Sequence, residues 1–441
     1  MTELIWEGKY DEAGRKVAPL RVALPFQTVE TVNESAQERQ RMLDLWGSGR
    51  DTEWRNRLIW GDKKYVLPSL LEEFAGKVDL IYIDPPFLTG ADFSFVVELN
   101  GDEFVKEPSI IEQKAYRDTW GRGLESYLQW FYESVVVLKD LLSETGSIYV
   151  HFDWHIGHYA KILMDEVFGT DRFLNDIIWQ RTASHNDPRR YGIIHDILLF
   201  YSKTRDYTWN DPKAAHSPEY MNSFFIYAES PGGEVVKLKT GDEAPVGWRR
   251  FRLGNFASPH PRPNLTYEYK GYKPPKNGWK VSIERMVELD SEGRLWFPPS
   301  KDGRIQTKSY WDEVEDGKAA PDIWIGMMAL QAQSPEKVEY ETQKPEAVLE
   351  RVIRASSNEG DLVLDCFVGS GTTAVVAEKL GRRWIAGDLG RFAIHTTRKR
   401  LLEIPDVRPF VVQNLGKYER QSGRPRSSAS RWRRSRPPTA G

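Results

Sequence analysis

The sequence has very little cysteine, with Cys366 the only one among 441 residues. A disulfide framework and a structural metal site built on cysteine thiolates are therefore excluded. The sequence also lacks an apolar run of about 18 residues, the length that a membrane-spanning helix needs. Its first residues, MTELIWEGKYDEAGRK, contain acids where a signal peptide has a basic and then an apolar stretch. We therefore expect a cytoplasmic protein with no membrane partner.

Net charge is also scarce, because 61 Lys and Arg stand against 64 Asp and Glu, a sum of −3. The charges are unevenly distributed along the chain. Residues 179–312 contain 21 basic and 16 acidic side chains, and residues 417–441 contain 8 and 1, so these blocks carry +5 and +7 and the remainder carries −15. A basic block in an acidic protein is typical of a nucleic-acid surface, although exposed loops alone can also produce one.

Short apolar strands alternate with helical patterns in two separate parts of the chain. VDLIYI at 78–83 and GSIYVHF at 146–152 predict buried strands in the first part. In the second part, 362–365 predicts a strand and 372–380 a helix. Residues 205–325, which lie between the two parts, are rich in Pro, Gly and aromatic residues and show little helical periodicity. The pattern predicts an α/β fold, with a mostly parallel sheet formed from two chain segments and flanked by helices, and an irregular or β-rich insert between the segments.

A glycine turn follows the predicted strand at 362–365 and reads DCFVGSGTT. Glycines let the backbone approach a ligand closely and present N–H groups at a helix start. The turn lacks the third glycine of a dinucleotide fingerprint and is not followed by GK[ST], which disfavours pyrophosphate or triphosphate as the ligand. Asp388 ends the next predicted strand, where an acid can bind a ribose diol. A tight structural turn is the alternative interpretation.

A second unusual loop, Asp84-Pro85-Pro86-Phe87, follows the predicted strand at 78–83. The two prolines stiffen the turn and offer carbonyls without N–H groups. The loop thus presents a carboxylate and a carbonyl as rigid acceptors beside an aromatic face. Such a site suits an amino group on an aromatic ring, although a D-P-P turn can also simply end a strand.

Three stretches carry a family resemblance: IDPPF at 83–87, TQKPEAVLERVIRAS at 342–356, and DLVLDCFVGSGTTAVVAEKLGRRWIAGD at 361–388. Together they resemble the amino-methylating DNA methyltransferases, which transfer a methyl group from S-adenosylmethionine to adenine or cytosine amino nitrogens. The catalytic loop precedes the cofactor loop, as in the permuted class called beta. The likeness runs from about residue 55 to 416 and implies a Rossmann-like methyltransferase fold, a double-stranded DNA partner and a place at the nucleoid.

The resemblance and the patterns together imply five parts of the chain. They are a leader at 1–54 with a helix near 34–45, a catalytic half at 55–204, a target-recognition insert at 205–325, a cofactor-binding half at 326–416 and a basic tail at 417–441. We expect the tail to be disordered, either as a phosphate-binding arm or as an out-of-frame terminus.

The resemblance also assigns roles to single residues. Asp84 and the Pro85 carbonyl would hold the target amino group, Pro86 would stiffen the loop, and Phe87 would stack on the flipped base. The residues expected to bind S-adenosylmethionine are Asp365, Phe367, Gly369, Gly371, Thr372, Asp388, Lys344 and Asp62. Lys344 would lie near the amino-acid end of the donor, and Asp62 is a weaker candidate for the same pocket. No metal is expected, and the nearby histidines are assigned a structural role: His151, His155 and His158.

Several alternatives stay open. Methylation of cytosine carbon 5 is excluded, because it needs a cysteine nucleophile and Cys366 lies inside the cofactor turn with no preceding proline. Adenine is favoured because Asp at the first position of the tetrapeptide is commoner among adenine-specific relatives, with cytosine N4 as the alternative. Methylation of RNA or of a protein glutamine, and a non-catalytic DNA-binding specificity subunit, are further alternatives. The resemblance leaves open a restriction endonuclease subunit as partner and a homodimer.

Overall fold

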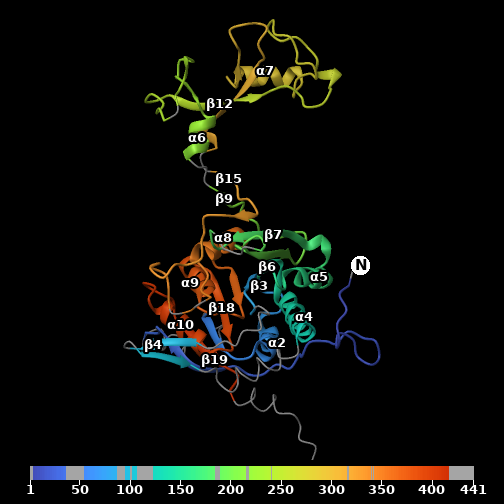
Figure 1. Ribbon diagram of the computed structural model, residues 1–441, viewed down its shortest axis with the longest axis vertical. Coiled ribbons are helices and arrows are strands. Elements are labelled where there is room, and N and C mark those ends of the chain that lie inside the picture. The colour runs from blue at the N-terminus through green and yellow to red at the C-terminus, as the bar shows by residue number, and fades with distance from the viewer. Residues whose placement is uncertain are drawn as a thin grey trace, which may run out of the picture. The chain divides into compact units, whose positions relative to one another are not determined.

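The computed structural model describes residues 3–35, 54–86, 95–99, 102–106, 123–183, 189–214, 218–239, 241–314, 317–338, 340 and 342–416. The chain forms two compact units (Figure 1), a sheet unit of Met1–Asn210 with Asp322–Gly441 and an insert unit of Asp211–Pro321. Most of the helix expected near 34–45 and the whole tail at 417–441 lie outside the described residues.

The sheet unit is built on ten strands in the order β1-β19-β2-β18-β17-β3-β6-β8-β7-β16. Their bounds are β1 Gln27–Val32, β19 Phe410–Asn414, β2 Asn56–Trp60, β18 Arg383–Asp388, β17 Leu362–Asp365, β3 Val78–Ile83, β6 Leu142–Phe152, β8 His195–Ser202, β7 Phe173–Gln180 and β16 Ile323–Trp324. The six strands from β19 to β6 run parallel to one another. A separate antiparallel pair is formed by β4 (Phe95–Leu99) and β5 (Asp102–Lys106). The predicted α/β fold with a mostly parallel sheet is confirmed.

The two chain segments interleave within this sheet. Strands β17 and β18 come from the second segment and lie between β2 and β3 of the first, and Figure 1 shows the red β18 among the strands of the blue part. At the far edge, β1 pairs antiparallel with β19. The sequence pattern did not indicate the edge strand β1, because most of its side chains are exposed and so carry no apolar alternation.

Helices cover both faces of the sheet. One face carries α2 (Lys63–Phe74), α4 (Leu124–Leu141) and α5 (Gly157–Phe168), and the other carries α8 (Glu346–Ser356), α9 (Thr372–Lys379) and α10 (Arg391–Leu402). Alternate residues of β3 enter the two cores, Leu80 on one face and Ile81 on the other. This burial on both faces explains the continuous apolar run VDLIYI. Among the described residues, no helix is both long and apolar enough to cross a membrane.

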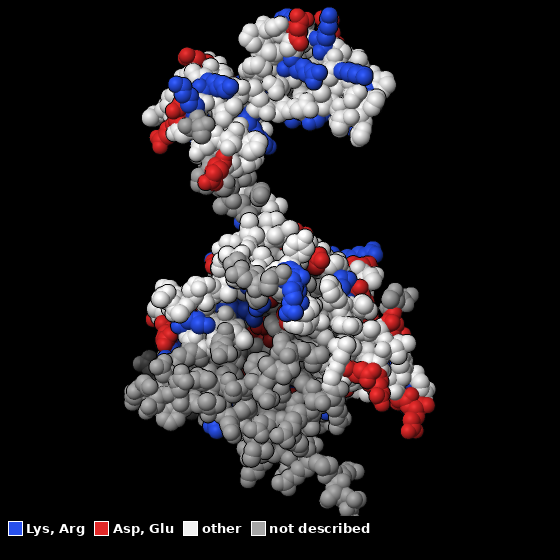
Figure 2. All heavy atoms as spheres, viewed as in Figure 1, with Lys and Arg blue, Asp and Glu red and all other residues white. Residues whose placement is uncertain are grey.

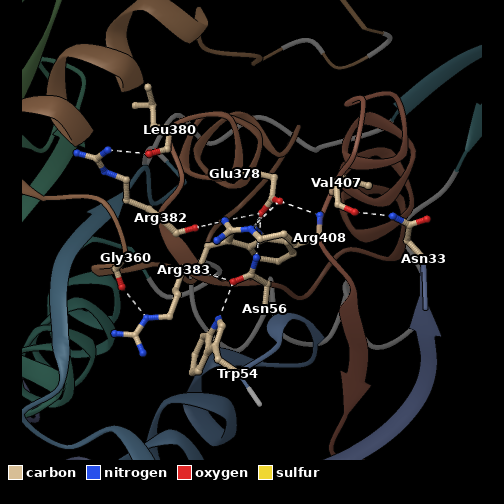
Figure 3. Close-up of polar contacts among 11 residues, drawn as sticks. Asn33, Trp54, Asn56, Gly360, Glu378, Leu380, Arg382, Arg383, Val407 and Arg408 are labelled. Carbon is tan, nitrogen blue, oxygen red and sulfur yellow. Dashed lines mark hydrogen bonds and ion pairs between the residues drawn. The ribbon is translucent and has the colours of Figure 1, made fainter. Parts of the chain in front are cut away.

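A buried polar network joins the segments at the amino ends of the strands (Figure 3). Its centre is the Glu378 carboxylate, which accepts hydrogen bonds from Asn56 Nδ2 and Trp384 Nε1, both at 2.9 Å. Arg408 donates to the same carboxylate through Nε at 3.0 Å and Nη2 at 2.9 Å. Asn56 Oδ1 in turn accepts from the Trp54 indole at 2.9 Å. The buried charge is therefore fully paired, as such a charge must be.

The insert unit has its own small sheet and core. Its antiparallel strands, in spatial order, are β11 Val235–Lys237, β10 Tyr227–Glu229, β12 Arg249–Asn255, β14 Gln306–Tyr310 and β13 Leu295–Trp296. The insert unit also contains the helices α6 (Pro218–Phe224) and α7 (Ile283–Ser291) and the strand pair β9 (Lys213–Ala214) and β15 (Lys318–Ala319). Two short 3-10 helices, η2 (Pro263–Leu265) and η3 (Trp311–Glu313), complete it. A third 3-10 helix, η1 (Thr170–Arg172), belongs to the sheet unit. The part of the insert unit around α7 has a hydrophobic core built largely of aromatic residues, among them Tyr269, Tyr272 and Trp279.

Candidate active site

Aspartates follow five neighbouring parallel strands at one edge of the sheet. In spatial order they are Asp62 after β2, Asp388 at the end of β18, Asp365 at the end of β17, Asp84 after β3 and Asp153 after β6. Ligands of open α/β sheets bind at this carboxyl edge. The predicted catalytic loop and the predicted glycine turn therefore follow adjacent strands. Asp153 was not predicted, although an acid directly after a buried strand is the same signal that marks Asp84.

The Asp365 carboxylate holds the glycine turn together. It is 3% exposed and accepts hydrogen bonds from the Phe367 backbone N–H at 2.9 Å and from Thr373 Oγ1 at 2.6 Å. Burial, with a smaller contribution from the nearby charges of Asp84 and Asp388, raises the pKa of Asp365 to about 7 against the effect of these hydrogen bonds. Both oxygens are thus engaged within the turn, and the side chain shapes the pocket.

The two glycines of the turn have different reasons to be glycine. Gly371 precedes α9 with a φ of +88°, and a Cβ there would lie 2.7 Å from Thr397 Oγ1 on α10. This glycine therefore lets two helices pack closely. Gly369, with a φ of +53°, donates its N–H to Asp388 Oδ2 at 2.9 Å, and Gly390 N–H donates to Asp388 Oδ1 at 2.8 Å. The turn and the acid of the next strand are thus locked together.

An aromatic pair lies beside the turn. The rings of Tyr340 and Phe392 are stacked with centroids 5.8 Å apart and planes 6° apart. A Cβ added at Gly369 would lie 3.5 Å from Tyr340 Cε1, so the pair is next to the turn that binds Asp388. An acid for a diol, a glycine turn and flat apolar rings together fit a nucleoside-bearing cofactor. Nothing in the spacing of the sequence marks Tyr340 or Phe392, and we did not predict them.

Lys344 connects the cofactor segment with the predicted catalytic loop. Its ammonium contacts the Asp84 carboxylate, and the two side chains are only 12% and 19% exposed. Its backbone carbonyl accepts from Thr372 Oγ1 at 3.1 Å, and Arg400 Nη1 lies 3.0 Å from the same hydroxyl. The structure places the Lys344 ammonium on Asp84. The expected place of Lys344 near the amino-acid end of the donor stays a prediction.

A buried polar chain lies on the three strands β3, β6 and β8 near Asp84. The Tyr82 hydroxyl is 2.8 Å from His151 Nδ1, and His151 Nε2 is 3.2 Å from Asp196 Oδ2. Burial raises the pKa of Asp196, but the hydrogen bond with His151 and the charges of Arg181 and Lys344 outweigh burial and hold the pKa below its ordinary value. His151 thus has protein partners on both ring nitrogens, which agrees with a structural role.

The remaining predicted residues are placed as follows. Pro85 is buried and Pro86 is partly exposed, while Phe87 lies outside the described residues. Asp62 caps α2 by accepting from the Lys64 backbone N–H at 2.9 Å. His155 Nδ1 contacts Asp153 Oδ2 at 2.5 Å. Within the described ranges, no cluster of His, Cys, Asp or Glu is arranged to hold a metal ion.

Comparison with known proteins identifies the family. Type II methyltransferase M.EcaI of Enterobacter cloacae is 31% identical over 350 residues, which cover 78% of this chain and 69% of that protein. DNA adenine methyltransferase YhdJ of Escherichia coli is 24% identical over 376 residues, 83% of this chain and 92% of that protein. The Mod subunit of the type III restriction-modification enzyme StyLTI of Salmonella typhimurium is 26% identical over 349 residues, and the chain spans about half (49%) of its length. Residues 78–399 match the DNA methylase family, and the chain belongs to that family.

Proposed function

We propose that this chain transfers a methyl group from S-adenosylmethionine to the exocyclic amino group of adenine in double-stranded DNA. One observation carries the proposal. Asp84 follows β3, the glycine turn follows the adjacent β17, and Asp388 ends the next strand, β18. An acceptor site for an amino group and a site for a nucleoside-bearing donor therefore share one edge of the sheet. Membership of the DNA methylase family supports the same reaction.

The donor pocket uses residues on both sides of the glycine turn. Asp388 binds the ribose diol, and the Tyr340–Phe392 pair offers a flat surface beside it. When bound, S-adenosylmethionine supplies a methyl group on a positively charged sulfur. The carboxylates along this edge of the sheet favour a cationic ligand electrostatically.

Asp84 and Pro85 act on the target amino group. The nitrogen is a poor nucleophile, because its lone pair is delocalised into the ring. The Asp84 carboxylate and the Pro85 carbonyl accept its two N–H bonds and so favour a localised lone pair, an interaction that strengthens in the transition state. Asp84 also accepts the proton that the nitrogen releases on methylation. The base is buried in a duplex and must be flipped out to reach this loop, with Phe87 as its stacking surface.

Adenine is proposed over cytosine for two reasons. Asp84 occupies the first position of the tetrapeptide, which is commoner among adenine-specific relatives, and the similar YhdJ is named as an adenine methyltransferase. Cytosine N4 is the alternative target. The intact Asp84, glycine turn and Asp388 argue against a non-catalytic specificity subunit.

Nucleoside analysis tests the proposal directly. Purified protein is incubated with unmodified duplex DNA and methyl-labelled donor, and the digested DNA is analysed by mass spectrometry. Labelled N6-methyldeoxyadenosine is the expected product, and labelled N4-methyldeoxycytidine would establish the alternative. Asp84→Ala should abolish the label while circular dichroism shows a preserved fold. Lack of label in DNA of any sequence would overturn both targets.

Partners beyond DNA are proposed from relatives. Similarity to the Mod subunit of StyLTI supports a restriction endonuclease subunit as partner, and a homodimer is a further proposal. If the protein methylates chromosomal DNA, it is located at the nucleoid. Size-exclusion chromatography with light scattering, alone and after mixing with a candidate restriction endonuclease subunit, would distinguish a monomer, a dimer and a complex.

A further inference from the structure

Arg400 is a buried cation on α10 that binds the glycine turn. Its side chain is 6% exposed. The Nη1 atom donates to the Ser370 carbonyl oxygen at 2.9 Å and to the Thr372 hydroxyl at 3.0 Å. The Nη2 atom donates at 3.1 Å to Glu346 Oε1, in the first turn of α8. One guanidinium therefore joins the turn to the helix that begins two residues after Lys344.

The chemistry of the groups fixes the direction of the hydrogen bonds in this cluster. A guanidinium only donates, and a carbonyl oxygen only accepts. The Thr372 hydroxyl therefore accepts from Arg400 and gives its own hydrogen to the Lys344 carbonyl at 3.1 Å. The Ser370 hydroxyl, 3.1 Å from the same oxygen, then acts as a second donor to it. Beyond this carbonyl, the ammonium of Lys344 contacts the Asp84 carboxylate.

Packing alone does not require an arginine at this position. Apolar residues of similar volume can often replace a buried ion pair without loss of stability. Burial lowers the pKa of Arg400 against the effect of Glu346, which shows that the charge is unfavourable where it lies. What the arginine adds is direction, because its rigid fork of donors fixes several partners at defined angles at once. Here the partners are the backbone of the turn and the two sides of Lys344.

We propose that Arg400 is a positioning residue for methyl transfer, which holds Lys344, and through it Asp84, in a fixed place relative to the glycine turn. The assignment rests on the proposed function, in which the turn binds the donor and Asp84 holds the target amino group. Displacement in line requires that the donated methyl group and the nitrogen stay aligned, so a small misplacement of either side slows transfer. Arg400 acts on this alignment through the Thr372 hydroxyl.

A double-mutant cycle tests the assignment. The single-turnover rate of methyl transfer to unmodified duplex DNA is measured with saturating labelled S-adenosylmethionine, so that a weaker donor affinity does not enter. Arg400→Met should lower the rate about tenfold. In a Lys344→Met background the same change should lower the rate less than about twofold, because the residue through which Arg400 acts has lost its ammonium. Effects that multiply in the double variant would overturn the assignment.

Thr372 provides a test that leaves the buried charge in place. Thr372→Val has nearly the shape of threonine but no hydroxyl, so it interrupts the connection between Arg400 and the Lys344 carbonyl. It should lower the saturated rate about as much as Arg400→Met does. Thr372→Ser restores the hydroxyl and should recover most of the wild-type rate. A wild-type rate in a folded Thr372→Val protein would contradict the proposed connection.

Lys379 supplies the matched control. Its ammonium lies 2.6 Å from Glu346 Oε2, the other oxygen of the carboxylate that Arg400 binds, and its side chain is 47% exposed. Lys379→Met should keep the wild-type rate. Calorimetry gives the donor affinity of every variant. If Arg400→Met lost donor affinity but kept the saturated rate, its role would be confined to the donor pocket and the assignment would fall. Lack of transfer by the wild-type protein would instead overturn the proposed function, and the assignment with it.

Discussion

Asp84 is held by a cation that the chain supplies from 260 residues away. The ammonium of Lys344 reaches it because the lysine backbone is fixed to the start of α9 through the Thr372 hydroxyl. The carboxylate is therefore oriented by the cofactor segment and not only by its own loop. Residues that orient a reacting group contribute to rate, because a small misplacement slows transfer strongly.

We expect Lys344→Met to lower the single-turnover rate of methyl transfer by about 10- to 100-fold, since Asp84 loses its orienting partner. The affinity for S-adenosylmethionine should change far less. Rapid-quench measurement with labelled donor gives the rate, and calorimetry gives the affinity. Lys337→Met, which removes a lysine with a backbone carbonyl partner in the same segment, serves as the control. An unchanged rate would contradict the orienting role.

Asp365 should make stability depend on pH. Its pKa is raised from 3.8 to about 7 in the folded protein, so the folded state binds a proton more tightly than the unfolded state. Its contribution to stability is therefore present below about pH 4 and is lost as the pH rises toward 7, with a slope no steeper than about 1.4 kcal/mol per pH unit.

Asp365→Asn keeps an acceptor for the turn but cannot titrate. The free energy of unfolding of the wild-type protein, measured relative to this variant by urea denaturation, should decrease between pH 4 and pH 7 and be level at higher pH. Glu359→Gln, an exposed acid just before the same strand, controls for net charge. If the free energy of unfolding of the wild-type protein relative to Asp365→Asn increased with pH instead, a raised pKa of Asp365 in the folded protein would be contradicted.

At the scale of elements, the network around Glu378 fastens α9 to strands of both chain segments (Figure 3). Removing one partner of a buried, hydrogen-bonded charge leaves the other unpaired, so Glu378→Ala should lower the free energy of unfolding by about 3–5 kcal/mol. Chemical denaturation measures this loss. Glu350→Ala breaks an exposed pair with Arg354 on α8 and should cost about 1 kcal/mol or less. Similar losses for both variants would exclude a special role of the network.

Strands buried on both faces were predictable to the residue. The predicted 78–83 and 362–365 coincide with the bounds of β3 and β17, and the predicted 146–152 falls within β6. Their apolar runs come from contact with both helix layers. The edge strand β1 and its neighbour β19 were missed, because their pairing depends on distant chain segments and because most side chains of β1 are exposed and show no pattern.

The site was predictable only where residues follow strands. The sequence placed Asp84 and Asp388 at the ends of strands, and a parallel sheet brings those ends to one edge, while their roles there stay predictions. The partner of Lys344 was missed, because no spacing reveals a contact between residues that far apart.

At the scale of the whole molecule, the bounds of the insert unit change the net charge assigned to the middle of the chain. The insert unit contains 17 basic and 16 acidic residues, a net charge of +1, which is less than the +5 counted over 179–312. Ion pairs occupy several of its cations, such as Arg249 with Asp312 at 2.8 Å and Arg294 with Glu313 at 2.6 Å. Figure 2 shows cations of the insert unit both around α7 and around β12, with acidic side chains among them.

The excess of positive charge belongs to the loop at 258–280. This loop has one acid and five exposed basic residues: Arg262, Lys270, Lys273, Lys276 and Lys280. The helix α7, which follows it, contains three acids and one arginine. We therefore expect the loop to contact the DNA phosphates.

Changing Lys273, Lys276 and Lys280 together to Ala should weaken DNA binding at every sequence. It should also reduce the slope of log affinity against log salt by about 3, since each phosphate contact contributes about 0.9. Fluorescence anisotropy over a salt series measures both quantities. The matched control changes Arg249, Arg285 and Arg294, which are already ion-paired, to Gln. An equal effect of both triple variants would refute the loop as the contact.

The interleaving of the two chain segments also affects how the protein is made. A ribosome finishes β3 at residue 83, but β17 and β18, which fill the gap between β2 and β3, are complete only at residue 388. At about 5–20 residues per second, that delay is roughly 15–60 s. During this time the edges of β2 and β3 lack their neighbours in the sheet, and such unpaired edges invite aggregation. We therefore expect the nascent chain to need protection from aggregation during this delay, as a consequence of the strand order.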